Sequence, residues 1–282
     1  MHETGHFSTK SGMSLFEQRW LPEAPVRAHV VLLHGFGDHS GRYGYVAERL
    51  NAAGIAVHAY DQRGHGRSPG RRAYIARFET LLDDLDDYLA HIGPELADSP
   101  WFFMGHSMGG MVLARYGETR QCGPRGMIFS SPFLGMNPDV SPLLLKLASI
   151  LSVIAPWLPV GQVDNTGLSR DLEMVQAADT DPLTFHGRVA ARTGAEFHRI
   201  IQRADRESGK IKTPALVFHG SQDRVVPPSG SQKLYDGLGS ADKTLKFYEG
   251  GFHELWNDLC KKEVLDDILN WVEKRLGEKA ES

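Results

Sequence analysis

The 282 residues fit one α/β domain of ordinary size with room for an insertion. Hydrophobic residues make up 41% and charged residues 23% of the chain, a composition that supports a buried core and excludes a disordered protein. The formal charge of −4, without any Lys/Arg-rich run, excludes a nucleic-acid binder.

Two features bear on the cellular compartment. The first residues lack the basic start and apolar stretch of a secretory signal. Cys122 and Cys260 lie far apart in the sequence, and we expect both to be free thiols, as in a reducing cytosol. The sequence therefore predicts a cytoplasmic protein.

Short apolar runs of strand length alternate with helical patterns along most of the chain. The first segment, Thr4–Leu21, predicts an antiparallel hairpin at a sheet edge. The later predicted strands are Val30–Leu33, Ile55–Tyr60, Trp101–Met104, Met127–Phe129, Ala215–Phe218 and Leu245–Tyr248. The predicted helices between them are Val46–Ala53, Phe78–Ile92, Gly109–Glu118, Ser229–Leu238 and Lys262–Leu276. This order predicts a mostly parallel, eight-stranded sheet with helices on both faces.

The alternation stops between residues 133 and 210, where we find helical patterns and no good strand. The predicted helices there are Pro142–Ile154, Leu172–Ala178 and Gly187–Asp205. A helical insertion between two strands of a parallel sheet indicates a cap over the carboxyl ends of the strands, where open sheets keep their sites. We expect a first core part at 1–132, the helical cap at 133–210 and a second core part at 211–282.

The segment Gly105-His106-Ser107-Met108-Gly109 matches the G-x-S-x-G pattern of a nucleophile elbow. It follows a predicted strand and opens a predicted helix, which is the context that the elbow requires. Glycine two residues before and after the serine avoids collisions in so tight a turn. The pattern predicts Ser107 as a nucleophile, against the alternative of an ordinary strand–helix turn. Epoxide hydrolases and dehalogenases need a carboxylate at this position, so the serine argues against them.

A serine nucleophile needs a base and an acid that orients the base. In this elbow architecture the chain order is nucleophile, acid, histidine, each after a later strand. Asp223 follows the predicted strand Ala215–Phe218, and His253 follows Leu245–Tyr248. We therefore predict Asp223 as the acid and His253 as the base.

Some proteins with this elbow place the acid one strand earlier in the chain. Here the loop Ser130–Phe133, after the strand Met127–Phe129, offers no carboxylate until Asp139. Glu254, beside His253, is interpreted as a surface or rim group rather than a triad member.

Acyl transfer also needs two donors for the oxyanion. One is the backbone N–H of Met108, directly after the nucleophile. We assign the other to the N–H of Phe36, in the glycine-rich loop after the strand Val30–Leu33. A plain glycine-rich turn is the alternative for this loop.

Other polar groups are interpreted as structural. The segment Asp61–Ser68 is expected to tie loops together beneath the site through buried side chains, and His219 to support a strand end. The aspartates of the helix Phe78–Ile92 are expected to face water and not to bind a metal: Asp83, Asp84, Asp86 and Asp87.

Several motifs together resemble the monoacylglycerol lipase family. His34–Tyr43, HGFGDHSGRY, is similar to the family's H-G-x-G-E-H-S-G-R-Y signature. Further similar segments are Gly105–Gly110, Asp61–Ser68, Leu168–Asp171, Thr180–Leu183 and Lys243–Gly250 with His253. The resemblance covers nearly the whole chain and implies an α/β-hydrolase fold that hydrolyses monoacylglycerols to glycerol and fatty acid without a metal or cofactor.

The resemblance also implies roles for the loop and the cap. Asp38 stands where relatives commonly have glutamate, and with Arg42 it is expected to serve the glycerol end of the substrate. The apolar tract Pro142–Pro159 fits a cap that carries an acyl channel and contacts a membrane surface. The expected partner is a lipid ester, with transient peripheral membrane contact; the sequence leaves the oligomeric state open.

Three alternatives stay open at the level of sequence. Lysophospholipases and broad carboxylesterases share most of these motifs, so the ester is less well defined than the chemistry. A catalytically inactive binding module is the alternative from another class, although such proteins usually lose a member of the triad that is present here.

Overall fold

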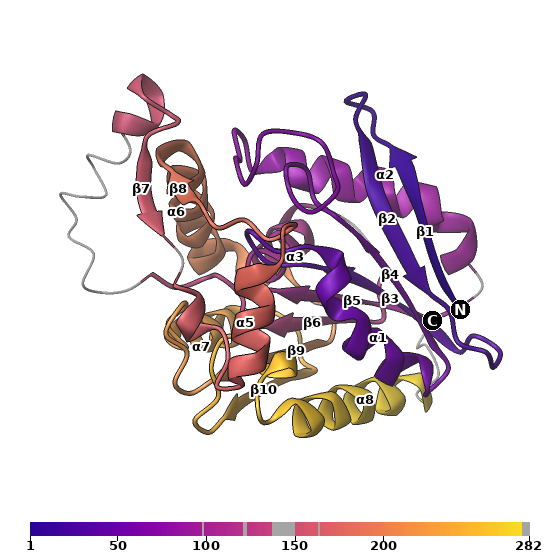
Figure 1. Ribbon diagram of the computed structural model, residues 1–282. Helices are drawn as coiled ribbons and strands as arrows, with labels where there is room; N and C mark the ends of the chain where they lie inside the picture. The colour runs from indigo at the N-terminus through magenta and orange to yellow at the C-terminus, as the bar shows by residue number, and fades with distance from the viewer. Residues whose placement is uncertain (98, 121–122, 137–149, 163, 278–282) are drawn as a thin grey trace.

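The computed structural model describes residues 1–97, 99–120, 123–136, 150–162 and 164–277 (Figure 1). Its main sheet has eight strands in the order β1-β2-β4-β3-β5-β6-β9-β10. Their bounds are β1 His2–Ser8, β2 Ser14–Trp20, β3 Ala28–Leu33, β4 Ile55–Tyr60, β5 Trp101–His106, β6 Gly126–Ser130, β9 Ala215–Gly220 and β10 Lys243–Tyr248. Within this order, β4, β3, β5, β6, β9 and β10 pair in parallel. At the edge, β1 and β2 form an antiparallel hairpin, and β2 pairs antiparallel with β4. The predicted fold class is confirmed.

Helices cover both faces of the sheet, each over its own buried cluster. The core helices are α1 Gly44–Asn51, α2 Glu79–Leu96, α3 Met108–Thr119, α7 Ser229–Gly237 and α8 Lys261–Gly277. One cluster joins the sheet to α1 and α8, and the other joins it to α2, α3 and α7. All five predicted core helices are present, with ends shifted by a few residues. Because strands such as β4 and β9 are buried along their whole length, they read as apolar runs that are interrupted only by His58 and His219.

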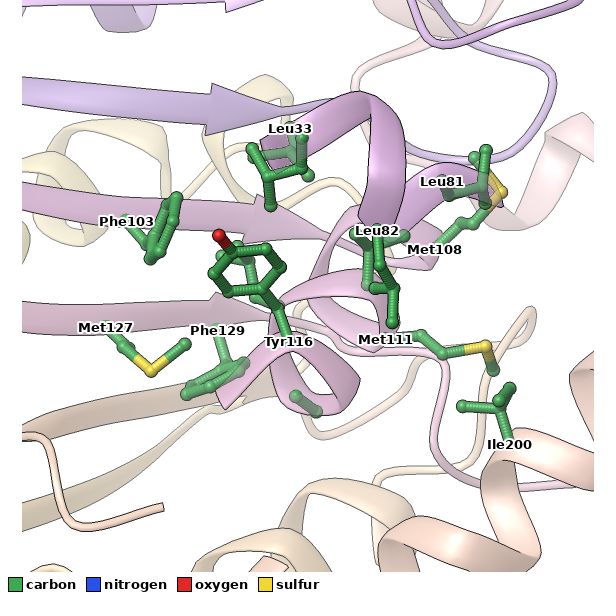
Figure 2. Close-up of a cluster of buried hydrophobic side chains, with 14 of the residues drawn as sticks. Leu33, Leu81, Leu82, Phe103, Met108, Met111, Tyr116, Met127, Phe129 and Ile200 are labelled. Atoms are coloured by element: carbon green, nitrogen blue, oxygen red, sulfur yellow. The ribbon is translucent and has the colours of Figure 1, made fainter. Parts of the chain in front are cut away.

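The packing of α3 determines where the G-x-S-x-G serine lies. Figure 2 shows Met108 and Met111 of α3 on the side of Leu82 of α2 and Ile200 of α6 (Ala191–Glu207), in the cluster that also contains Phe103 of β5. Each of these side chains is at most 1% exposed. Full burial of such a side chain is worth about 1.5–3 kcal/mol. Since α3 begins directly after the serine, this packing holds the nucleophile in place.

The prediction for the acidic face of α2 is wrong for two of its four aspartates. Asp84 is 1% exposed and pairs with Arg63, and Asp87 is 8% exposed and accepts the backbone N–H of Lys10 at 2.7 Å. Both lie under the loops that cross this helix. Burial of a carboxylate is tolerated here because each has such a partner.

The inserted segment is not all helical, contrary to the prediction. It contains η2 (Asn165–Gly167), α5 (Leu172–Thr180), α6 and η3 (Ser208–Lys210), but also the antiparallel pair β7 (Pro159–Gln162) and β8 (Arg188–Ala190). The helix predicted from Gly187 therefore begins only at Ala191. Strands of three and four residues that include Pro159 and Gly161 are too short to show an alternating pattern. We keep 1–132, 133–210 and 211–282 as the proposed division of the chain.

Most of the predicted helix Pro142–Ile154 lies outside the described residues, which include helical residues 150–154. Four large apolar side chains after residue 149 face outward: Ile150, Val153, Ile154 and Trp157, which are 55–75% exposed. We call these four residues the apolar tip. Among the described residues, no helix is long and apolar enough to cross a membrane.

Candidate active site

Ser107 lies in the turn between β5 and α3 with φ of 50° and ψ of −114°. This left-handed conformation is strained for a residue with a side chain and is typical of a nucleophile elbow. A Cβ on Gly105 would lie 2.6 Å from the backbone of Gly109, and one on Gly109 would collide with the carbonyl of Leu33. The Ser107 carbonyl accepts the N–H groups of Met111 and Phe133 at 3.0 Å each, so the strained turn is held from two directions.

Asp223 and His253 come together from the loops that follow β9 and β10. His253 Nδ1 donates to Asp223 Oδ2 at 2.6 Å. The other carboxylate oxygen, Oδ1, accepts the backbone N–H groups of Val225 and Val226 at 2.7 and 2.9 Å. The imidazole that holds this bond lines the same cavity as Ser107. The structure thus brings the three predicted triad residues to one place.

A second histidine shares the aspartate. His219 Nε2 lies 2.8 Å from Asp223 Oδ2, and its Nδ1 lies 2.7 Å from Ser231 Oγ. His219, Asp223 and His253 are also a group among the described residues whose ligating atoms, within 4.8 Å of one another, could hold a metal ion. Their separations of 2.6 and 2.8 Å are hydrogen-bond lengths, so we interpret the group as one carboxylate shared by two imidazoles.

Electrostatics at the pair favour a charged imidazole. Burial lowers the pKa of His253, but the negative charge of Asp223 and its hydrogen bond raise it more, so the pKa lies above the usual value of 6.5. Burial raises the pKa of Asp223, but the two histidines lower it by more, so the pKa lies below its usual range and the carboxylate stays ionised. The neighbouring ring of His106 has its pKa lowered to about 3 by burial and by His253, and it stays neutral.

The predicted oxyanion loop lies against the nucleophile. A Cβ on Gly35 would lie 3.4 Å from the Cβ of Ser107, so the glycine that precedes Phe36 lies beside the serine. Met108 opens α3 directly behind Ser107, where the first N–H groups of a helix have no partner within it. The positions fit two donors for an oxyanion.

Asp38 and Arg42 form a buried cluster with a third residue, Glu254. Arg42 donates to both carboxylate oxygens of Glu254 at 2.8 and 2.7 Å and to Asp38 Oδ1 at 3.2 Å. Asp38 Oδ2 accepts the hydroxyl of Tyr43 at 2.9 Å. The interpretation of Glu254 as a surface or rim group is wrong: it is 4% exposed.

The charges of this cluster are stabilised mutually. Burial raises the pKa of Asp38, but Arg42 and the nearby histidines outweigh it and lower the pKa to about 2. Burial also raises the pKa of Glu254, and Arg42 lowers it below its usual range. The cluster therefore holds two carboxylates and one guanidinium beside His253, the predicted base.

Backbone contacts hold the histidine loop on both sides. Ser131, at a positive φ of 41°, donates its hydroxyl to the His253 carbonyl at 2.9 Å. Glu254 N–H donates to the carbonyl of Leu168, in the inserted segment, at 2.7 Å. Sequence reasoning missed these supports, because a strained serine and a backbone bond across 86 residues leave no local signal.

The structural interpretation of Asp61–Ser68 is confirmed. Asp61 Oδ1 accepts the backbone N–H and hydroxyl of Ser40, and Oδ2 accepts the N–H of Arg67. Ser68 Oγ donates to the Asp61 carbonyl and accepts the N–H of Phe16. These bonds tie the loop that contains Asp38 and Arg42 to the edge of the sheet.

Two adjoining cavities open at the site. The apolar cavity has a volume of about 380 Å³ and is lined by Ser107 and His253 together with Phe133, Phe197, Ile201 and Val226 among others. The polar cavity has a volume of about 500 Å³ and is lined mostly by loop and cap residues, with Asp38, Arg42 and Glu254 among them. Five residues line both cavities: Phe36, Asp38, Asp164, Leu168 and Glu254. An ester held at Ser107 can therefore place an apolar part in one and a polar part in the other.

Of the two cysteines, Cys260 is a free, half-buried thiol, and Cys122 lies outside the described residues.

Comparison with known proteins identifies the family. Residues 24–260 match the Hydrolase_4 family, described as serine aminopeptidase S33. The chain is 35% identical over 270 residues to the monoacylglycerol lipase of Mycolicibacterium smegmatis, covering 96% of each chain. It is 32% identical to the human monoglyceride lipase over 273 residues, covering 96% of this chain and 90% of the relative.

Solved structures agree with these relatives. The crystal structure of Paleococcus ferrophilus monoacylglycerol lipase superimposes with a TM-score of 0.81 at 33% identity, covering 98% of this chain and 99% of that one. Fold, site geometry and full-length identity point the same way. The chain belongs to the Hydrolase_4 family of α/β hydrolases and, within it, to the monoacylglycerol lipases.

Proposed function

We propose that the protein is a serine esterase that hydrolyses monoacylglycerols to glycerol and free fatty acid through an acyl-enzyme on Ser107. The observation that carries the proposal is the Asp223–His253 hydrogen bond at the cavity that Ser107 lines. The relatives named above are monoacylglycerol or monoglyceride lipases, which supports this ester as the substrate.

We propose a reaction in two half-reactions. His253 removes the proton of Ser107 as its oxygen attacks the ester carbonyl, and Asp223 stabilises the imidazolium. The N–H groups of Phe36 and Met108 hold the oxyanion, and the alcohol leaves with the proton from His253. Water, activated by the same histidine, then releases the fatty acid and restores the serine.

The two cavities divide the substrate. We assign the acyl chain to the apolar cavity, whose Phe197 and Ile201 come from α6. We assign the glycerol to the polar cavity, where Asp38 and Arg42 lie. The shorter Asp38 side chain is compensated by Glu254, which supplies the second carboxylate to Arg42.

We further propose that the apolar tip contacts membrane surfaces transiently. Val153 is 75% exposed and Trp157 58%, and exposed apolar groups of this size on one surface are typical of such contact sites. A cytoplasmic location fits the free Cys260 thiol.

A substrate panel tests the function. The rates on monoacylglycerol, lysophosphatidylcholine and nitrophenyl esters of graded chain length are compared at matched concentrations. We expect monoacylglycerols with medium or long chains to react fastest. A preference for two- or four-carbon esters would favour a carboxylesterase, and a preference for the lysolipid a lysophospholipase. Failure to react with any serine-directed probe would favour a binding module.

A further inference from the structure

The polar cavity carries an excess of negative charge. Among the residues that the structure describes, its ionisable lining consists of four carboxylates, one guanidinium and one imidazole: Asp38, Asp164, Asp179, Glu254, Arg42 and His186. Asp38 and Glu254 lie buried at the boundary with the apolar cavity, whereas Asp164 and Asp179 are exposed at the rim. An alcohol leaving group in this cavity would therefore meet carboxylates both at the exposed rim and at the buried inner end.

The single guanidinium of this cavity is already engaged. Arg42 binds both oxygens of Glu254 and one of Asp38, so its positive charge is already matched by two carboxylates before an anion enters. Arg224 lines the apolar cavity instead; it lies over the ring of Phe252 at 4.5 Å, and its positive charge lowers the pKa of Asp164. The cavity therefore presents acceptors and negative charge to a ligand.

We infer that the polar cavity admits uncharged polyol leaving groups and repels anionic ones, and that Asp164, Asp179 and Glu254 determine this specificity together with Asp38. The inference deepens the proposed function and rests on it. Hydroxyl groups donate to carboxylates in short, strong hydrogen bonds. The oxygens of a phosphate are themselves acceptors and cannot donate to these carboxylates. Repulsion between the phosphate charge and the carboxylate charges discriminates strongly against such a leaving group. A phosphorylated lysolipid is thereby excluded although it shares the acyl ester.

Three octanoyl esters, used below their critical micelle concentrations, test the inference on the full chain: 1-octanoylglycerol, 1-octanoylglycerol 3-phosphate and methyl octanoate. We expect kcat/KM for either uncharged ester to exceed that for the phosphate by about a hundredfold, and the difference to narrow at high salt. Equal values for the phosphate and the glycerol ester would overturn the inference.

Variants locate the effect. Asp164→Asn combined with Asp179→Asn should lower the preference over the phosphate by about three- to tenfold, mainly through the KM of the phosphate ester. Glu254→Gln should lower it further. Glu263→Gln, which removes an exposed carboxylate from α8, is the matched control and should leave the preference unchanged. An unchanged preference in both the rim double variant and Glu254→Gln contradicts the inference.

The same data separate this inference from the proposed function. If methyl octanoate reacts and octanoylglycerol does not, the assignment of monoacylglycerol is wrong. The ratio of methyl to phosphate ester then still reports whether the cavity repels an anion.

Discussion

In the α/β core, β4, β6 and β9 bury every side chain, whereas the inserted segment leaves Val153, Ile154 and Trp157 open to solvent. The proposed triad belongs to the core: Ser107, Asp223 and His253 all follow core strands. The segment contributes Leu168, Phe197 and the rim aspartates of the cavities instead. We therefore propose that the core sets the chemistry and that the inserted segment selects which substrates reach it.

The largest effect should come from the nucleophile. Ser107→Ala should lower kcat on every ester by at least about 10⁴-fold, because it removes the covalent step while both cavities stay intact. Steady-state kinetics on octanoylglycerol and methyl octanoate check this, with circular dichroism to verify folding. A folded variant that keeps more than a few per cent of either rate would place the chemistry elsewhere.

Asp223→Asn should lower kcat by about 10³–10⁴-fold, again regardless of the ester, since His253 loses the carboxylate that orients its ring and stabilises the imidazolium. The pKa of His253 is raised in the wild type, and only the neutral imidazole can act as base, so the acid limb of kcat/KM should lie above pH 6.5. In the variant the midpoint should move to lower pH. A pH profile that does not move would mean that this carboxylate is not coupled to the base.

Arg42→Met examines the buried ionic cluster that the core contributes to the polar cavity. It leaves Asp38 and Glu254 buried without their cation, which typically costs about 3–5 kcal/mol of unfolding free energy. Urea denaturation checks the loss, with Arg27→Met as the control, because the Arg27–Glu273 pair is exposed. Equal stability of the two variants would show that the cluster is not a buried ionic network.

The smallest effect should come from the apolar tip, and it should depend on how the substrate is presented. Val153→Ser with Trp157→Ser should slow hydrolysis of monoacylglycerol in vesicles several-fold, because less apolar surface is available for the bilayer. The rate on octanoylglycerol in free solution should hardly change. Equal losses on both would assign the tip to catalysis rather than to membrane contact.

The same contrast explains what could be predicted from the sequence. The core strands, the elbow at Ser107 and the positions of Asp223 and His253 follow from local patterns, because strand, turn and residue type coincide within a few positions. The β7–β8 pair was missed because its strands are too short to show a period.

Glu254 and Ser131 were missed for a different reason. The partner of Glu254, Arg42, lies 212 residues away, and Ser131 acts through the carbonyl of His253, 122 residues away. Such pairings are set by the tertiary fold and leave no trace in the neighbouring residues. The same holds for Asp84, whose charge is offset by Arg63 from a separate loop.

The most direct test of the central claim is to map the covalent adduct of a fluorophosphonate by mass spectrometry of the digested protein. We predict one adduct, on the peptide that contains Ser107. The adduct should be absent in Ser107→Ala, and it should form much more slowly in Asp223→Asn. An adduct on any other residue, or labelling that survives Ser107→Ala, would contradict the claim that the core elbow carries the chemistry.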